Sequence, residues 1–153
     1  MRGGRALDKD AAPAGRTADM IIVVCIDDQG GMVFNHRRQS QDKLLRLDLL
    51  KQADGKPVWM NEYSCKLFDP APENIRVAED FAARAGKGEY CFFEDVFPGP
   101  WLDKAEMIVV YRWNRMYPSD LPRFPMPLTG RSVKEQADFA GSSHERISKE
   151  IWV

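Results

Sequence analysis

The sequence predicts an α/β fold: a single domain with a mixed sheet flanked by helices and closed by a C-terminal antiparallel hairpin. Three observations lead to this prediction. Short apolar runs, typical of strands buried on both faces, recur at 20–26, 89–93 and 107–113. A leucine-rich segment at 42–52 separates the first two runs and has the broad apolar face of a helix. Two final segments, 133–139 and 147–153, flank a Gly-Ser-Ser turn, as the strands of a hairpin do.

The first half of the domain alternates strand and helix. The strand at 20–26 ends in two carboxylates and a glycine pair, and a dense polar segment follows it. We expect Ser40 to cap the next helix and Asp42 to lie in its first turn, near the positive end of the helix dipole. Residues 53–56 stop this helix near Gln52. A short strand at 57–60 comes next. Residues 61–64 then lead into a short helix that ends near Phe68, before a proline-rich turn at 69–72.

The second half adds shorter elements. A minor strand is expected at 75–77 and a helix at 79–85, which glycines end. The buried strand 89–93 comes next, and Glu94 and Asp95 follow its last residue. A helical turn at 101–105 leads into the strong strand 107–113. A polar, proline-containing loop at 114–124 then precedes the closing pair.

Composition excludes several classes of protein. A net charge of -1 gives no basic field for nucleic acid or an anionic membrane, and no apolar run approaches the length of a membrane span. Three scattered cysteines indicate a reduced, cytoplasmic chain, and two distant histidines argue against a metal site. Residues 1–19 are small and charged, so we expect a disordered N-terminal extension before a domain at 20–153.

The order of these elements resembles the dihydrofolate reductase family. The strand ending in Asp27, followed by Gly30-Gly31-Met32, is similar to that family's first strand and the start of its mobile loop. The helix that begins near Asp42 resembles the substrate-side helix, and Asp42 is the residue that could match the family's substrate-binding carboxylate. Further similar segments follow in the family's order, at 56–60, 101–111 and 120–125. The resemblance implies a reductase fold over residues 20–153.

The cofactor motifs of that family are replaced in this sequence. Where the family holds cofactor phosphates with Gly-Arg-x-Thr, this chain has Asn61-Glu62-Tyr63-Ser64, which puts an anion in place of a cation. Where the family has a glycine pair against the pyrophosphate, this chain has Glu94-Asp95. The segment 68–81 is also too short to carry the arginine for the folate tail. These departures argue against NADPH binding and folate reduction, and leave the cofactor unknown.

Three polar segments follow the predicted strands and form the candidate ligand site: residues 35–42, 61–64 and 94–95. The arginines and the amides beside them near a helix start suit an anion, and a carboxylate pair can act as acid and base. Glu94 and Asp95 could instead pair with Arg37 or Arg38. Asp42 and Glu94 are the weak catalytic candidates. The predicted ligand-binding residues are Asn35, Arg37, Arg38, Gln39, Ser40, Asp42, Asn61, Tyr63, Glu94 and Asp95.

The leading hypothesis is a degenerate reductase-like protein, not itself a reductase, that binds a small polar or nucleotide-like ligand or a protein partner. One alternative is an NADPH-dependent reductase of a pterin-like substrate. Another is an RNA-associated protein using Arg37, Arg38, Arg112 and Arg115, although nucleic acid is a poor match to the net charge. A zinc-dependent ribonuclease is not supported, because His36 and His144 cannot supply a His-x-His-x-Asp-His motif. Gly141 to Glu145 reads as a hairpin turn, with His144 directed at the cleft.

Overall fold

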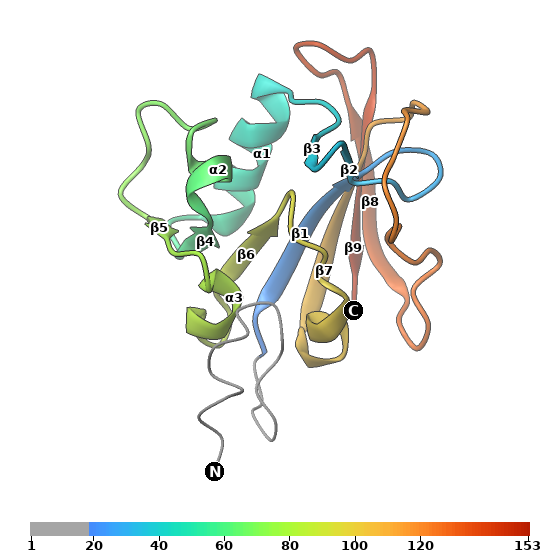
Figure 1. Cartoon of the computed structure of the whole chain (residues 1–153). Coiled ribbons are helices and arrows are strands. Elements are labelled where there is room, and N and C mark those ends of the chain that lie inside the picture. The colour runs from blue at the N-terminus through green and yellow to red at the C-terminus, as the bar shows by residue number, and fades with distance from the viewer. Residues whose placement is uncertain (1–18) are drawn as a thin grey trace.

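A central seven-stranded sheet organises the computed structural model, which describes residues 19–153 (Figure 1). Its strand order is β5-β4-β6-β1-β7-β9-β8; β9 runs antiparallel to both neighbours, and the other adjacent pairs are parallel. The predicted mixed sheet with an antiparallel C-terminal edge is therefore confirmed. The strands of this sheet are β1 (Ile21–Ile26), β4 (Val58–Met60), β5 (Ile75–Val77), β6 (Tyr90–Phe93), β7 (Met107–Arg112), β8 (Val133–Phe139) and β9 (Ile147–Trp152).

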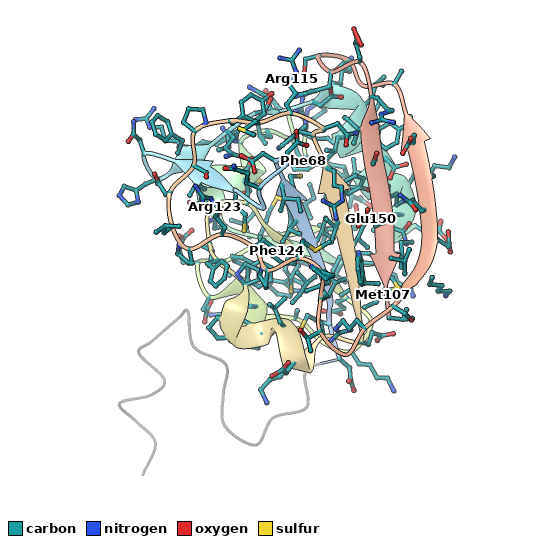
Figure 2. The ribbon with its side chains drawn as sticks, turned by 90° about the vertical axis from the view of Figure 1, so that its right-hand side faces the viewer. Phe68, Met107, Arg115, Arg123, Phe124 and Glu150 are labelled. Atoms are coloured by element: carbon teal, nitrogen blue, oxygen red, sulfur yellow. The ribbon has the colours of Figure 1, made fainter. Side chains whose placement is uncertain are left out.

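The two faces of the sheet carry separate cores. Helix α1 (Lys43–Ala53) covers one face, where Leu45 and Leu49 pack against residues of β1, β6 and β7. The other face is covered by α3 (Phe81–Arg84), the 3-10 helix Gly99–Lys104 and the loop after β7. Phe124, labelled in Figure 2, comes from that loop and is buried there. Burial on both faces explains why β1 and β6 read as continuous apolar runs.

The start of α1 corrects one sequence expectation. Asp42, not Ser40, is the N-cap: its backbone is extended (φ -153°, ψ 126°) and its carboxylate accepts hydrogen bonds from the N–H groups of Leu44 and Leu45. Both residue types favour this position, and the local sequence does not choose between them. The helix ends at Ala53, followed by Asp54 with φ 50° and Gly55 with φ +83°.

Three further features differ from the predictions. The helix expected at 79–85 is a single turn, α3. The short helix expected after residues 61–64, ending near Phe68, is also one turn, α2, and it lies earlier, at Glu62–Cys65. A small hairpin of β2 (Val33–Phe34) and β3 (Arg37–Arg38) was not predicted. Its two turn residues, Asn35 and His36, have φ of 53° and 63°, which matches a type I′ hairpin turn. Asn-His lacks the glycine that normally signals this turn.

The predicted disorder of the N-terminal extension falls on residues 1–18, which lie outside the described residues. Asp19, the last residue of that expected extension, is part of the fold: its N–H donates to Lys104 O at 2.9 Å, and its carbonyl accepts from Gly88 N–H at 2.9 Å. All three cysteines are free, with Cys91 buried and Cys25 half-buried in the apolar layers. Across residues 19–153, no helix has the length and apolarity needed to cross a bilayer.

Candidate functional site

An ion pair between Arg38 and Glu94 joins two of the predicted polar segments. Arg38 Nε donates to Glu94 Oε2 at 2.6 Å, and Arg38 Nη2 donates to Glu94 Oε1 at 3.1 Å. The guanidinium also lies 4.0 Å from the centroid of the Tyr63 ring. Burial alone would lower the pKa of Arg38, but the hydrogen bond and charge of Glu94 raise it above its usual value. Arg38 is therefore a permanent cation whose charge is neutralised within the protein.

The third polar segment completes this cluster. Ser64 Oγ donates to Glu94 Oε1 at 2.7 Å, and Asn61 Nδ2 donates to Asp95 Oδ1 at 2.8 Å. Asn61 also caps α2, since its Oδ1 accepts from Ser64 N–H at 2.9 Å. The ends of β4 and β6 thus meet as expected for neighbouring parallel strands. We call the set Arg38, Asn61, Tyr63, Ser64, Glu94 and Asp95 the Arg38–Glu94 cluster.

Gln39 belongs to a different arrangement, centred on the buried Asp27 at the end of β1. Asp27 Oδ1 accepts from the N–H groups of Gln29 and Gly31, and Oδ2 accepts from Gln39 Nε2 at 3.0 Å. Gln39 Nε2 also donates to Pro118 O at 3.1 Å. Its Oε1 is the one buried side-chain oxygen or nitrogen of residues 19–153 without a hydrogen-bond partner. Gln39 therefore fastens the loop after β1 to the loop after β7.

Gly31 lies inside this junction, and a side chain there is expected to disrupt it. A Cβ at position 31 would approach Ser119 Cβ to 2.5 Å and the Asp27 carboxylate to 2.8 Å. We expect Gly31→Ala to lower the free energy of unfolding by about 1–3 kcal/mol, because backbone or neighbours must shift. Urea denaturation measures this. Gly86→Ala is the matched control, since its nearest contact is Glu89 at 3.4 Å; an equal loss in both variants would contradict the steric explanation.

Ser40 and Asp42 lie beside His144, although 104 and 102 residues of sequence separate them from it. We call Ser40, Asp42 and His144 the His144 cluster. His144 Nδ1 lies 3.0 Å from Asp42 Oδ2, and Nε2 lies 2.9 Å from Ser40 Oγ and 3.2 Å from Tyr117 Oη. The imidazole stacks on Trp113 with ring centroids 4.4 Å apart. Asp42 and His144 are both buried.

The Asp42 carboxylate is held by the hairpin turn that precedes β9. The N–H of Ser142 donates to Oδ1 at 2.9 Å and the N–H of Ser143 donates to Oδ2 at 2.8 Å. Burial alone would raise the pKa of Asp42, but these hydrogen bonds and that with His144 lower it well below its usual value. With its acceptor sites occupied by protein donors, Asp42 has a structural position and does not face an open cleft.

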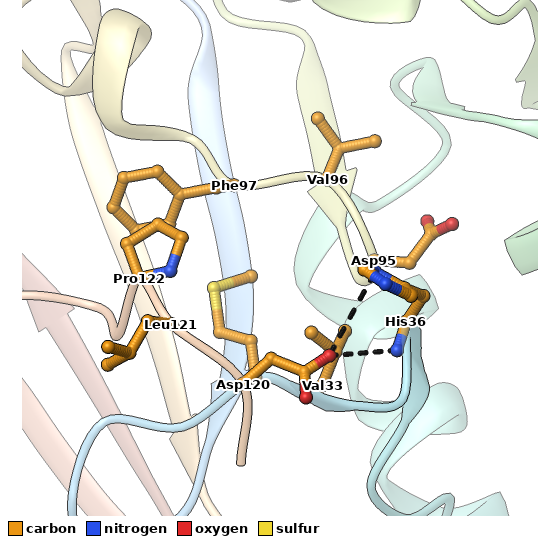
Figure 3. Close-up of a pocket in the computed structure, with 9 residues that line it drawn as sticks. Val33, His36, Asp95, Val96, Phe97, Asp120, Leu121 and Pro122 are labelled. Carbon is orange, nitrogen blue, oxygen red and sulfur yellow. Dashed lines mark hydrogen bonds and ion pairs between the residues drawn. The ribbon is translucent and has the colours of Figure 1, made fainter.

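A pocket of about 190 Å³ lies between the β2–β3 hairpin, the exit of β6 and the loop after β7; we call it the hairpin pocket (Figure 3). Asp120 joins two of its walls by accepting from the N–H groups of Asn35 at 3.0 Å and His36 at 2.8 Å. These backbone hydrogen bonds lower the pKa of Asp120. The pocket is lined by Met32, Val33, His36, Asp95, Val96, Phe97, Asp120, Leu121 and Pro122.

The predicted site residues therefore divide into separate groups. Five belong to the Arg38–Glu94 cluster or the hairpin pocket, Gln39 lies with Asp27, and Ser40 and Asp42 belong to the His144 cluster. Asn35 and Arg37 are exposed on the β2–β3 hairpin. The sequence predicts that His144 is directed at the cleft. It does not predict that Tyr117 lies beside His144, or that Asp120 contacts the β2–β3 hairpin. Asp120 opens the segment 120–125 that resembles the reductase family, but that resemblance does not predict its contact with the hairpin, and Tyr117 stands in no motif.

The other proposed chemistries find less support in the geometry. Arg112, one arginine of the suggested RNA surface, donates from Nε to Glu150 Oε2 at 2.8 Å, so its charge is already paired; Glu150 lies on β9 (Figure 2). Within residues 19–153, no group of three or more His, Cys, Asp or Glu side chains is arranged to hold a metal ion.

Comparison with known proteins gives a structural relationship without a sequence relationship. No family model matches the chain, and no curated protein matches it. The structure is similar to dihydrofolate reductase from Enterococcus faecalis complexed with NADP(H) and RAB-propyl, with a TM-score of 0.62 and 7% sequence identity. The match covers 89% of this chain and 96% of that chain. At this identity the similarity establishes the fold alone: the chain has a dihydrofolate reductase-like fold.

Proposed function

We propose that this chain is a ligand-binding protein that keeps the dihydrofolate reductase-like fold but does not act as an NADPH-dependent reductase. The pairing of Arg38 with Glu94, beside Asp95, carries this proposal. A dinucleotide needs unpaired donors for its phosphates near the carboxyl ends of the strands. At the ends of β4 and β6, this chain presents carboxylates, and the nearby cation is already paired. Phosphate would be repelled there.

The hairpin pocket is the binding site in this proposal. Its walls combine apolar side chains, including Val96 and Phe97, with the carboxylates of Asp95 and Asp120. Its volume of about 190 Å³ is below the roughly 300–1,000 Å³ of pockets for drug-sized ligands. Size and charge together favour a small ring compound with N–H donors, neutral or cationic and without a phosphate, such as a nucleobase or an arylalkylamine.

A second function, NADPH-dependent reduction of a pterin-like substrate, is favoured by one observation. The similar enterococcal protein is a dihydrofolate reductase complexed with NADP(H), and the match extends over nearly all of it. This alternative requires the chain to bind NADPH despite Glu94 and Asp95.

A thermal-shift titration distinguishes the two functions. We expect saturable stabilisation by one or more of adenine, guanine, cytosine and benzylamine, and no shift with NADPH or dihydrofolate, because a ligand of the native state stabilises it by mass action. At a ligand concentration of 100 times Kd the gain is about 2.7 kcal/mol.

Val96→Trp should fill the hairpin pocket and abolish that shift. The matched control is Val133→Trp, which makes the same change on exposed β8 and should leave the shift intact. A saturable shift with NADPH, accompanied by loss of NADPH absorbance when dihydrofolate is added, would replace this proposal with the reductase. No shift with any nucleobase or amine would contradict binding of this ligand class.

A further inference from the structure

We propose that Ser40, His144 and Asp42 form a Ser-His-Asp triad that hydrolyses short-chain acyl esters, an activity separate from ligand binding in the hairpin pocket. The three side chains form one hydrogen-bonded line: Ser40 Oγ to His144 Nε2 at 2.9 Å, and His144 Nδ1 to Asp42 Oδ2 at 3.0 Å. Both distances lie within the range that a nucleophile, its base and the group orienting that base require. The order of the residues in the chain is not diagnostic, because triads are recognised by geometry and role.

The hydrogen bond with Asp42 places a proton on one ring nitrogen of His144. An ionised carboxylate only accepts hydrogen bonds, so the proton between Asp42 and His144 belongs to Nδ1. In the neutral form of the ring, Nε2 then carries a lone pair that can accept the hydroxyl proton of Ser40. This is the tautomer that a general base needs. Trp113, stacked on the ring, and the two backbone N–H groups on Asp42 hold the pair in place.

The surroundings of Ser40 suggest the size of the substrate. Ser40 is half-buried and lines a narrow space of about 10 Å³, whose walls include Cys25, Leu45 and Phe92. Such a space takes a group the size of one water or methyl, which favours an acetyl ester. His144 also lines a broad surface depression of about 500 Å³ that includes Arg115 and Arg146. The alcohol portion of the ester lies on this side, next to the base.

The reaction proceeds in two balanced steps. Ser40 Oγ attacks the ester carbonyl while its proton passes to Nε2 of His144; the carbon–oxygen bond to the alcohol then breaks, and the alcohol leaves with that proton. Water attacks the acetyl-Ser40 ester and gives a proton to Nε2, which returns it to Ser40 Oγ as acetic acid is released. Tyr117 Oη, 3.2 Å from Nε2, is a positioning residue for the ring in this scheme.

Labelling with a fluorophosphonate and mass-spectrometric mapping of the adduct tests the triad. We expect the adduct on Ser40, and hydrolysis of p-nitrophenyl acetate that exceeds hydrolysis of the octanoate ester. Ser40→Ala should abolish the adduct and lower the acetate rate at least about tenfold, a modest part of the loss usual for a triad member. Ser132 is exposed, so Ser132→Ala is the control with the same substitution. This variant should retain both the adduct on Ser40 and the rate of acetate ester hydrolysis.

The role of His144 is tested by His144→Gln, which should slow labelling of Ser40 at least about tenfold, as loss of a general base does. Because His144 is buried, the melting temperature of this variant must be measured as well. If it does not fold, the adduct position in the unmodified protein and the Ser40→Ala rate decide the matter. An adduct on Tyr117 or elsewhere, no adduct, or an unchanged acetate rate in Ser40→Ala would overturn the proposal. None of these outcomes bears on ligand binding in the hairpin pocket, which the Val96→Trp variant tests separately.

Discussion

Asp42→Ala is expected to destabilise the protein by about 3–5 kcal/mol, the largest effect of a single substitution that we anticipate. Loss of a helix N-cap costs about 0.5–2 kcal/mol, and each buried donor left without a partner adds roughly 1–3 kcal/mol until water reaches it. Asp42 caps α1 and also receives the N–H groups of Ser142 and Ser143 and the imidazole of His144. One carboxylate thus connects the start of α1 to the turn before β9.

Urea denaturation at neutral pH measures this loss. Asp138→Ala is the matched control, because that carboxylate is 45% exposed and contacts Arg146 at 3.4 Å on the surface; we expect a change within about 0.5 kcal/mol. Equal losses in the two variants would show that the bonds to the 142–144 turn contribute no stability.

The same carboxylate should make stability depend on pH. Although burial acts to raise the pKa of Asp42, the hydrogen bonds from Ser142, His144 and Ser143 lower it in the folded protein. A folded pKa below the unfolded value of about 3.9 means that the contribution is fully present above roughly pH 4 and is lost as the pH falls toward the folded value. Asp42→Asn should therefore show a weaker loss of stability between about pH 4 and pH 2 than the unmodified protein.

Arg38→Ala is expected to lower the free energy of unfolding by about 2–4 kcal/mol. The Glu94 side chain is only 7% exposed, so removing Arg38 leaves a buried carboxylate with Ser64 as its remaining side-chain donor. Breaking a fully buried pair costs about 3–5 kcal/mol, and the 21% exposure of Arg38 reduces this figure. The loss should appear as a lower urea midpoint with an unchanged slope.

A double-mutant cycle isolates the pair. Arg38→Met combined with Glu94→Leu should cost less than the sum of the two single changes, by about 1–3 kcal/mol, because the double variant leaves no unpaired charge. Arg84→Ala serves as the control, since its ion pair with Asp80 is exposed and should contribute about 0.5 kcal/mol or less. Additive losses for Arg38 and Glu94 would mean that the two charges are not coupled, which would weaken the argument that Arg38 is unavailable to phosphate.

The sequence by itself determined the α/β fold of this protein. The apolar runs of β1, β6 and β7 and the leucine face of α1 were visible because burial repeats over many neighbouring residues. The pairing of β8 with β9 was equally clear from its turn. The polar segments at the ends of β4 and β6 also met as predicted, since neighbouring parallel strands end at the same edge of a sheet.

Only the tertiary structure decided how the polar side chains are paired. The choice of Asp42 over Ser40 as the cap depends on Ser142 to His144, about a hundred residues away in the chain. The Arg38–Glu94 pair likewise depends on the β2–β3 hairpin, whose Asn-His turn lacks a glycine signal. The apolar residues of a buried strand or helix recur at short, regular spacing, so they can be recognised from the local sequence. A hydrogen bond between side chains far apart in the chain requires two atoms about 3 Å apart, and the packing of the whole sheet sets that distance.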